Sequence, residues 1–234
     1  MGVVRQLIGT MILAATAHAT PLQCVERYLG AHAEQRGGAW VAVLADGTAL
    51  PYDRGVRSAA ERLDDPAIKD IFATRYHTGP IKPVTDENED PGRARVEALY
   101  RAAYPESKLV KATFMGHPVQ VNDQVAPALA RIAARVGKDP ALAPFFAKLG
   151  GSHNDRVIAG TTRQSAHAWG IALDLNPALS HYWRWSKAGW QNKIPQKIVD
   201  AFEAEGFIWG GRWYHFDTMH FEYRPELLDG SCYP

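Results

Sequence analysis

Two stretches in the C-terminal half of this 234-residue chain decide its fold: Ser165-Ala-His-Ala-Trp-Gly-Ile-Ala-Leu-Asp-Leu-Asn176 and Trp213-Tyr-His-Phe-Asp-Thr-Met-His-Phe-Glu-Tyr223. Apolar and polar side chains alternate toward the end of each stretch. A period of two is typical of a β-strand that buries one face and keeps polar side chains on the other. We therefore expect two strands and, if the strands share a sheet, one polar face that carries both Asp174 and His220.

This polar face gathers side chains that suit a metal ion. His167 precedes the first strand in a connecting loop, so it can curl over the face that carries Asp174 and His220. Two imidazoles and one carboxylate are a suitable ligand set for a catalytic zinc ion, with a fourth position left open. Asp217 lies three residues before His220 and could take a proton from the attacking water without binding the metal. The alternative from spacing alone is a set of ordinary strand side chains, since the chain holds nine His residues.

The two stretches also resemble a known family. The patterns Ser-x-His-x-x-Gly-x-Ala-x-Asp-x-Asn, Gly-Phe-x-Trp-Gly-Gly-x-Trp and Phe-Asp-x-Met-His-Phe-Glu are similar to those of zinc D-alanyl-D-alanine carboxypeptidases and related L-alanyl-D-glutamate endopeptidases of bacteria and phages. The resemblance runs from about Asn154 to Glu226. It implies a hedgehog/D-Ala-D-Ala peptidase fold, with zinc held by His167, Asp174 and His220. It also implies that Asp217 is the catalytic base.

The same resemblance implies residues that bind the substrate. The family places an arginine on the strand before the first ligand, and Arg156 is the favoured match, with Arg163 as its rival. A guanidinium suits this role because it is always charged and can bind a carboxylate through two hydrogen bonds. Ser165 is expected to hydrogen-bond near the ligands, and the nearest alternative is a serine that only caps a loop. Trp213 is expected to form a cleft wall together with Trp209, and the alternative is that both are core aromatics.

Patterns outside these motifs predict an α+β protein with a small antiparallel sheet flanked by helices. Apolar residues recur at helical spacing between Asn122, the expected N-cap, and Gly137. A second amphipathic helix is expected from Pro195 to Gly206. The other expected elements are strands at 39–44, 48–52, 108–114 and 118–121, and helices at 66–72 and 93–104.

The amino-acid composition of the chain changes near residue 105. Six of the seven Trp residues follow this point, together with dense His, Gly and Arg. We therefore expect a zinc peptidase catalytic domain over residues 106–234 and an N-terminal region over residues 20–105. The N-terminal region could cover the cleft, limit substrate length or bind cell wall, and the sequence leaves this choice open. Its Pro- and acid-rich loop at 77–91 is expected to be a solvated connector.

The first 19 residues predict export. Arg5 precedes an apolar run from Leu7 to Ala17, and Ala17-His18-Ala19 matches the small-x-small pattern of a signal peptidase site. The alternative is a buried N-terminal helix. We expect a soluble periplasmic or extracellular protein after cleavage. In such an oxidising compartment Cys24 and Cys232 could form a disulfide, and the alternative is two free thiols.

Composition excludes several classes. Lys and Arg together number 26 and Asp and Glu 25, so no basic excess predicts binding to nucleic acid or to acidic membranes. No apolar stretch reaches 18 residues, so no transmembrane span is expected. The chain has neither the Ser-x-x-Lys motif of serine penicillin-binding enzymes nor a His-Glu-x-x-His zinc helix.

The resemblance and the predicted export together favour a D-Ala-D-Ala carboxypeptidase that acts on peptidoglycan stem peptides. An L-Ala-D-Glu endopeptidase of the cell wall is the nearest alternative. A non-catalytic zinc-containing binding module and a zinc amidase or esterase are further alternatives. Asp217 argues against the binding module, because a purely structural zinc site needs no base beside the metal.

Overall fold

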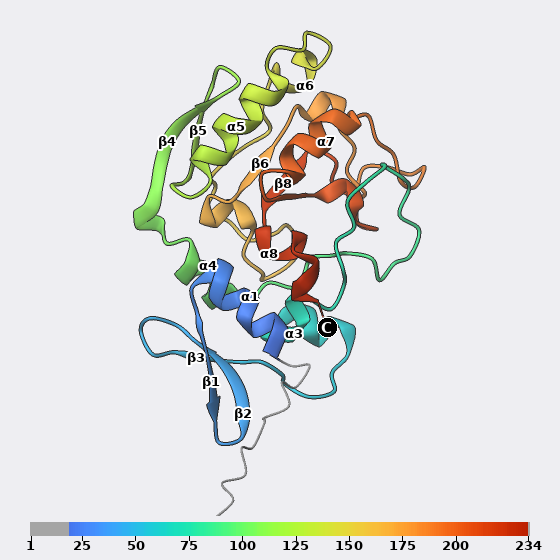
Figure 1. Cartoon of the computed structure of the whole chain (residues 1–234). Helices are drawn as coiled ribbons and strands as arrows, with labels where there is room; N and C mark the ends of the chain where they lie inside the picture. Colours follow the sequence, from blue (N-terminus) through green and yellow to red (C-terminus); the bar gives the residue numbers. More distant parts are fainter. Residues whose placement is uncertain (1–18, 234) are drawn as a thin grey trace, which may run out of the picture.

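Three small antiparallel sheets and eight short α-helices make up residues 19–233, which are the residues that the computed structural model describes (Figure 1). The predicted signal peptide lies outside these residues except for Ala19. The expected α+β class is confirmed. Among the described residues, no helix is both long enough and apolar enough to cross a membrane.

Each sheet is built from strands close in sequence, except for the one that carries the metal-ligand motifs. The first sheet has the order β1-β2-β3, the second is the hairpin β4-β5, and the third has the order β6-β8-β7. The strands are β1 His32–Arg36, β2 Ala39–Val43, β3 Ala49–Pro51, β4 Leu109–Phe114, β5 His117–Asn122, β6 Ala172–Asp174, β7 Phe207–Trp209 and β8 His220–Tyr223. The two strands expected from the alternating motifs therefore share a sheet, with β8 at its centre.

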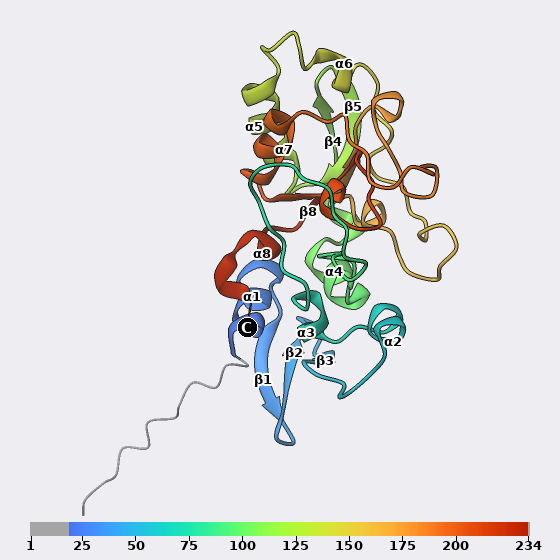
Figure 2. The same ribbon diagram turned by 90° about the vertical axis from the view of Figure 1, so that its right-hand side faces the viewer.

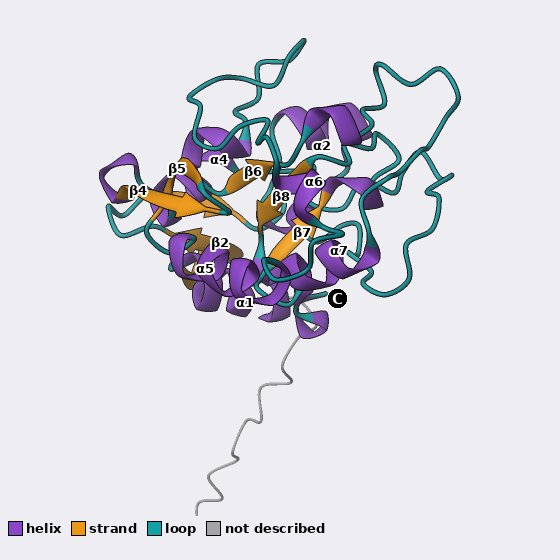
Figure 3. Cartoon of the chain, turned by 90° about the horizontal axis from the view of Figure 1, so that it is seen from above, coloured by secondary structure: helices purple, strands orange, loops and turns teal. Residues whose placement is uncertain are grey.

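The helices lie around these sheets. They are α1 Ala19–Leu29, α2 Ala59–Asp64, α3 Ile68–Ile71, α4 Glu97–Ala103, α5 Ala126–Val136, α6 Ala143–Phe146, α7 Gln196–Glu203 and α8 Pro225–Leu228. Helices α5 and α7 lie on the same side of the third sheet (Figures 2 and 3). Phe202 of α7 packs on Phe221 of β8, with their ring centroids 4.0 Å apart. This packing gives the third sheet its buried apolar face and leaves the opposite face for polar side chains.

Two helices begin several residues later than the sequence predicts. Asn122 is not the N-cap of α5, because it ends β5 and its side chain accepts a hydrogen bond from the Gln124 N–H within a tight turn. The N-cap position belongs to Val125. The helix expected at 93–104 begins only at Glu97.

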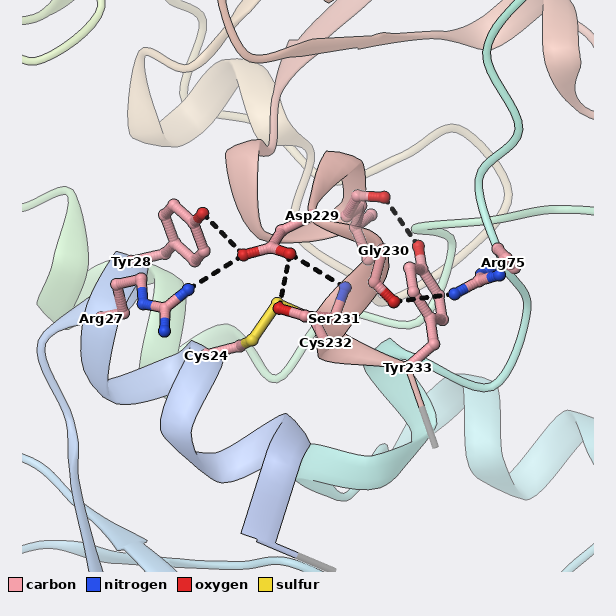
Figure 4. Close-up of a disulfide and its surroundings, with 10 residues drawn as sticks. Cys24, Arg27, Tyr28, Arg75, Asp229, Gly230, Ser231, Cys232 and Tyr233 are labelled. Atoms are coloured by element: carbon pink, nitrogen blue, oxygen red, sulfur yellow. Dashed lines mark hydrogen bonds and ion pairs between the residues drawn. A yellow bond between two sulfur atoms is a disulfide. The ribbon is translucent and has the colours of Figure 1, made fainter. Parts of the chain in front are cut away.

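The ends of the described chain are joined covalently. Cys24 of α1 and Cys232, in the 3-10 turn Gly230–Cys232, form the expected disulfide, with their Cα atoms 5.6 Å apart. Around this bond Asp229 accepts hydrogen bonds from Arg27 and Tyr28 at 3.0 Å each (Figure 4). Helix α1 also contacts α8, so the N-terminal region packs directly on the C-terminal end of the chain.

Candidate metal centre and active site

Strand pairing brings the expected ligands together. Asp174 of β6 lies directly opposite His220 of β8, and His167 comes from the 3-10 helix Ala166–Trp169 that precedes β6. One oxygen of the Asp174 carboxylate lies 3.2 Å from Nε2 of His167, and the other lies 3.0 Å from Nδ1 of His220. One potential ligand atom from each residue lies within 4.8 Å of those of the other two. The polar face predicted from the alternation therefore holds a compact cluster.

Local caps fix the position of His167. The Ser165 side chain accepts a hydrogen bond from the His167 N–H at the start of the 3-10 helix, so the loop-capping role applies. Gly170 ends this helix with a φ of +68° in the left-handed region, and a Cβ there would lie 2.8 Å from the backbone nitrogen of Asn122. Glycine is required at this position for both reasons. The chain can therefore turn sharply from His167 into β6.

Hydrogen bonds select which ring nitrogen of each histidine faces the cluster. Nδ1 of His167 donates to the backbone oxygen of Ser152 at 2.5 Å, and Nε2 of His220 donates to Glu222 at 3.3 Å. The opposite nitrogens, Nε2 of His167 and Nδ1 of His220, face Asp174. Proteins commonly orient metal-binding imidazoles in this way, through a hydrogen bond from the other ring nitrogen.

The electrostatics of the cluster fit a cation. Burial opposes ionisation of Asp174, but the two histidines hold its pKa well below its usual range. Burial lowers the pKa of His220, whereas its hydrogen bonds to Asp174 and Glu222 outweigh this effect and raise the pKa to about 10. Nε2 of His167 is buried and makes no hydrogen bond. This nitrogen is therefore free to bind a metal ion. Together with His220 and Asp174 it gives two imidazoles and one carboxylate, which is the donor set of a catalytic zinc site.

Asp217 lies beside this cluster without belonging to it. Its N–H donates to the Gly210 oxygen at 3.0 Å, and its own backbone oxygen accepts from the His220 N–H at 3.2 Å. Oδ1 of Asp217 is buried and makes no hydrogen bond. Burial, followed by the nearby carboxylate of Asp174, raises the pKa of Asp217 to about 7. A carboxyl group with such a pKa can both accept and donate a proton near neutral pH.

The seven residues that the sequence analysis favours for the site line one cavity of about 470 Å³. They are His167, Asp174, His220, Asp217, Ser165, Trp213 and Arg156. The Trp213 ring lies over the cluster, with its centroid 5.6 Å from that of His220. Trp209, in contrast, is fully buried and donates from Nε1 to the backbone oxygen of Thr218, so it is a core residue.

The two candidate arginines have different surroundings. Arg156 is exposed and donates to the backbone oxygen of its neighbour Val157 at 3.3 Å. Only 13% of the Arg163 side chain is exposed, and its Nε and Nη1 atoms are buried without a hydrogen bond. Both candidate arginines line the cavity, and Arg163 is the more enclosed of the two.

The cavity also contains residues that the sequence did not suggest. Asp90, Arg93 and Arg95 come from the N-terminal region and line the cavity with the metal-ligand candidates. The loop at 77–91 is therefore more than a solvated connector at its end, because Asp90 accepts hydrogen bonds from the backbone and ring of His215. No local pattern marks these residues as part of the site, since their partners in the C-terminal half, His215 and Glu222, lie more than 100 residues away in the chain.

A comparison with known families covers this part of the molecule. Residues 159–223 match the D-alanyl-D-alanine carboxypeptidase family. The matched segment contains all three candidate ligands and Asp217. No solved structure matches the chain.

Proposed function

We propose that the chain is an exported zinc metallopeptidase that hydrolyses peptide bonds in peptidoglycan stem peptides. The D-Ala-D-Ala carboxypeptidase reaction is the favoured activity, and a hedgehog/D-Ala-D-Ala peptidase-like catalytic domain is the proposed fold. The observation that carries this proposal is the position of Asp217, beside the ligand cluster and in the same cavity, within the segment that matches the peptidase family.

His167, Asp174 and His220 would hold the zinc ion. When bound, zinc supplies Lewis-acid chemistry, since it polarises a carbonyl group and lowers the pKa of water. Three protein ligands leave a position open for substrate, which distinguishes catalytic from structural zinc sites. The cavity that adjoins the ligands supports this distinction.

Asp217 moves the proton in the proposed reaction. Its carboxylate takes a proton from the attacking water and then gives it to the amine that leaves the cut peptide bond. The pKa of about 7 supports both steps, because neither the protonated nor the ionised form is strongly favoured near neutral pH. A non-catalytic zinc module would have no use for a buried carboxyl group at this point.

The cavity walls supply the groups that hold the substrate. Arg156 and Arg163 offer guanidinium groups for a carboxylate of the stem peptide. Trp213 offers an apolar wall beside the ligands. Since the two arginines line the same cavity as Asp217, one peptide could contact both the arginines and the reacting centre.

The disulfide supports export. Cysteine bridges persist in oxidising compartments such as the periplasm and the cell exterior, and they are rare in the cytosol. The Cys24–Cys232 bond is therefore what an exported protein would carry. Export would also bring the protein to its proposed substrate.

The first test is digestion of purified peptidoglycan by the protein without residues 1–19, followed by mass spectrometry of the products. We expect the loss of a terminal D-Ala from pentapeptide stems. Asp217→Ala should keep zinc but lower turnover about 100- to 10,000-fold, since it removes the proton-transfer group. His220→Ala should lose both zinc and turnover, whereas Asp86→Ala, which changes an exposed acid outside the cavity, should behave like the wild type.

Other products would redirect the proposal. Release of peptides that begin with D-Glu would establish the endopeptidase in place of the carboxypeptidase. A zinc-loaded protein that leaves peptidoglycan unchanged would favour the binding module. Wild-type turnover by Asp217→Ala would show that another group moves the proton.

A further inference from the structure

A fully buried carboxylate lies directly behind one candidate metal ligand. Glu222 and His220 are two residues apart on β8, so their side chains extend from the same face of the strand. Oε2 of Glu222 lies 3.3 Å from Nε2 of His220 and accepts its proton. This contact leaves Nδ1 as the nitrogen of His220 that faces Asp174 and the cavity.

Arg95 holds that carboxylate at both oxygens. Its Nε donates to Oε1 of Glu222 at 2.9 Å, and its Nη2 donates to Oε2 at 2.5 Å. A two-point contact between a guanidinium and a carboxylate fixes the plane of the carboxylate as well as its position. Only 9% of the Arg95 side chain is exposed, so water competes little for this contact.

Arg224 cannot replace Arg95 in this role. Nη1 of Arg224 donates to Oε1 of Glu222 at 2.8 Å, whereas its Nε donates to Glu226 at 2.6 Å. Among the described residues, Arg95 therefore makes the only arginine contact to Oε2, the oxygen that faces His220. Without Arg95, the carboxylate would keep one anchor and could rotate away from the imidazole.

We propose that Arg95 is a positioning residue of the metal centre. It orients Glu222, Glu222 orients the His220 ring, and the ring then presents Nδ1 to the metal ion. This inference rests on the proposed metal site, and it concerns how that site is assembled. The backbone oxygen of Ser152 acts on His167 in the same way, so each imidazole has a fixed partner on the side away from the cluster.

Arg95 comes from the N-terminal region of the chain and not from the segment that carries the metal-ligand candidates. Arg95 lies outside residues 159–223, which match the peptidase family, and within the N-terminal region at 20–105. Arg95 lies two residues before Glu97, where α4 begins. It falls in the segment 93–104, which the sequence pattern predicts to be helical. The N-terminal region therefore contributes to the metal centre as well as to the cavity wall.

The test compares zinc affinity in two matched variants. Arg95→Met removes the contacts to Glu222, and Arg57→Met removes a similarly buried arginine, which pairs with Asp70 at 2.7 Å elsewhere in the N-terminal region. Zinc affinity is measured by competition with a chromophoric chelator. We expect Arg95→Met to bind zinc about 10- to 100-fold more weakly than the wild type, whereas Arg57→Met should bind zinc as the wild type does. Both variants should unfold at lower temperature, so stability alone cannot explain a difference in affinity.

A second variant and a second measurement complete the test. Arg95→Lys keeps the positive charge but loses the two-point contact, so its zinc affinity should fall between those of the wild type and Arg95→Met. With cobalt in place of zinc, Arg95→Met should change the visible absorption bands of the site, because the ring of His220 is no longer held.

The outcomes separate this inference from the proposed function. A wild-type protein that binds no zinc would refute the proposed metal site itself. A wild type that binds zinc, with Arg95→Met at equal affinity, would refute only the role of Arg95. If Arg95→Met does not fold, Arg95→Lys decides, and wild-type affinity in that variant would count against the inference.

Discussion

At the scale of single residues, Asp217 combines a useful position with an unfavourable environment. Its carboxyl group is buried and lies near the carboxylate of Asp174, and both effects raise its pKa to about 7. Ionising such a group costs stability in the folded protein when no cation is present. Active sites commonly trade stability for function in this way.

The raised pKa of Asp217 should make the stability of the metal-free protein depend on pH. In the unfolded chain an aspartate has a pKa of about 3.9. As the pH rises from about 4 to 7, the unfolded chain therefore ionises Asp217 first, and the free energy of unfolding falls. Above pH 7 that loss is complete. Asp217→Asn lacks the ionisable group, so the metal-free variant should be more stable than the metal-free wild type at pH 8, by on the order of 4 kcal/mol.

Urea unfolding in the presence of a chelator measures this difference. The gain should be much smaller at pH 5, where folded Asp217 is still protonated. An equal gain at both pH values would mean that the asparagine stabilises by packing and not by removing a charge.

The sequence predicted those site residues that lie within a short motif. The spacing of His167, Asp174 and His220 predicted a shared face, and the structure places all three there. Arg95 could not be predicted, because its contact to Glu222 joins residues 127 positions apart. Glu222 was visible in the motif, but its partner was not.

At the scale of elements, the turn that carries Asp217 packs against a glycine. The 3-10 helix Gly210–Arg212 begins directly under this turn. A Cβ at residue 210 would lie 2.5 Å from the backbone oxygen of Asp217 and 3.0 Å from the Trp213 ring. Real Cβ atoms do not come so close, so the turn can keep its place only above glycine.

We predict that Gly210→Ala lowers turnover more than it lowers zinc affinity. The added methyl group should displace Asp217 and Trp213, while the ligands on β6 and β8 keep their strand pairing. A displacement of about 1 Å near the reacting groups can cost roughly 100-fold in rate. Steady-state kinetics and zinc competition check this pair of effects. Gly230→Ala is the control for a general glycine effect, because this glycine is exposed, lies outside the cavity and has room for a Cβ without a positive φ. Loss of zinc in Gly210→Ala would contradict the prediction.

Elements with periodic patterns were predicted, and elements without them were missed. Alternation predicted β6 and β8, which carry apolar side chains on one face and polar side chains on the other. Strand β7 shows no alternation because all three of its residues, Phe207–Trp209, are buried. Asn122 was misplaced because asparagine caps turns as readily as helices, and here it caps the turn that precedes α5.

At the scale of the whole molecule, the disulfide links the two ends of the fold. The bonded cysteines are separated by 208 residues, and α1 also packs on α8. The boundary expected near residue 105 stays a prediction. The contacts of Arg95 and of α1 nevertheless tie the N-terminal region to the C-terminal half at two separate places.

We predict that Cys24→Ser combined with Cys232→Ser lowers the stability by roughly 2–5 kcal/mol, because the unfolded chain is no longer closed into a long loop. Thermal unfolding in the presence and absence of a reductant measures this loss. Zinc affinity should stay unchanged at temperatures where the variant is folded, since neither cysteine lines the cavity. A variant with the wild-type unfolding temperature would show that packing of α1 alone holds the ends together.

The same bond has a consequence for a protein exposed to foreign proteases. Exposed loops are the usual sites of proteolytic nicking. A single cut anywhere between Cys24 and Cys232 would leave two fragments that remain one covalent molecule. Such a nicked form would migrate as an intact chain on a non-reducing gel and separate only after reduction. Damage that severs the backbone would therefore not release either half.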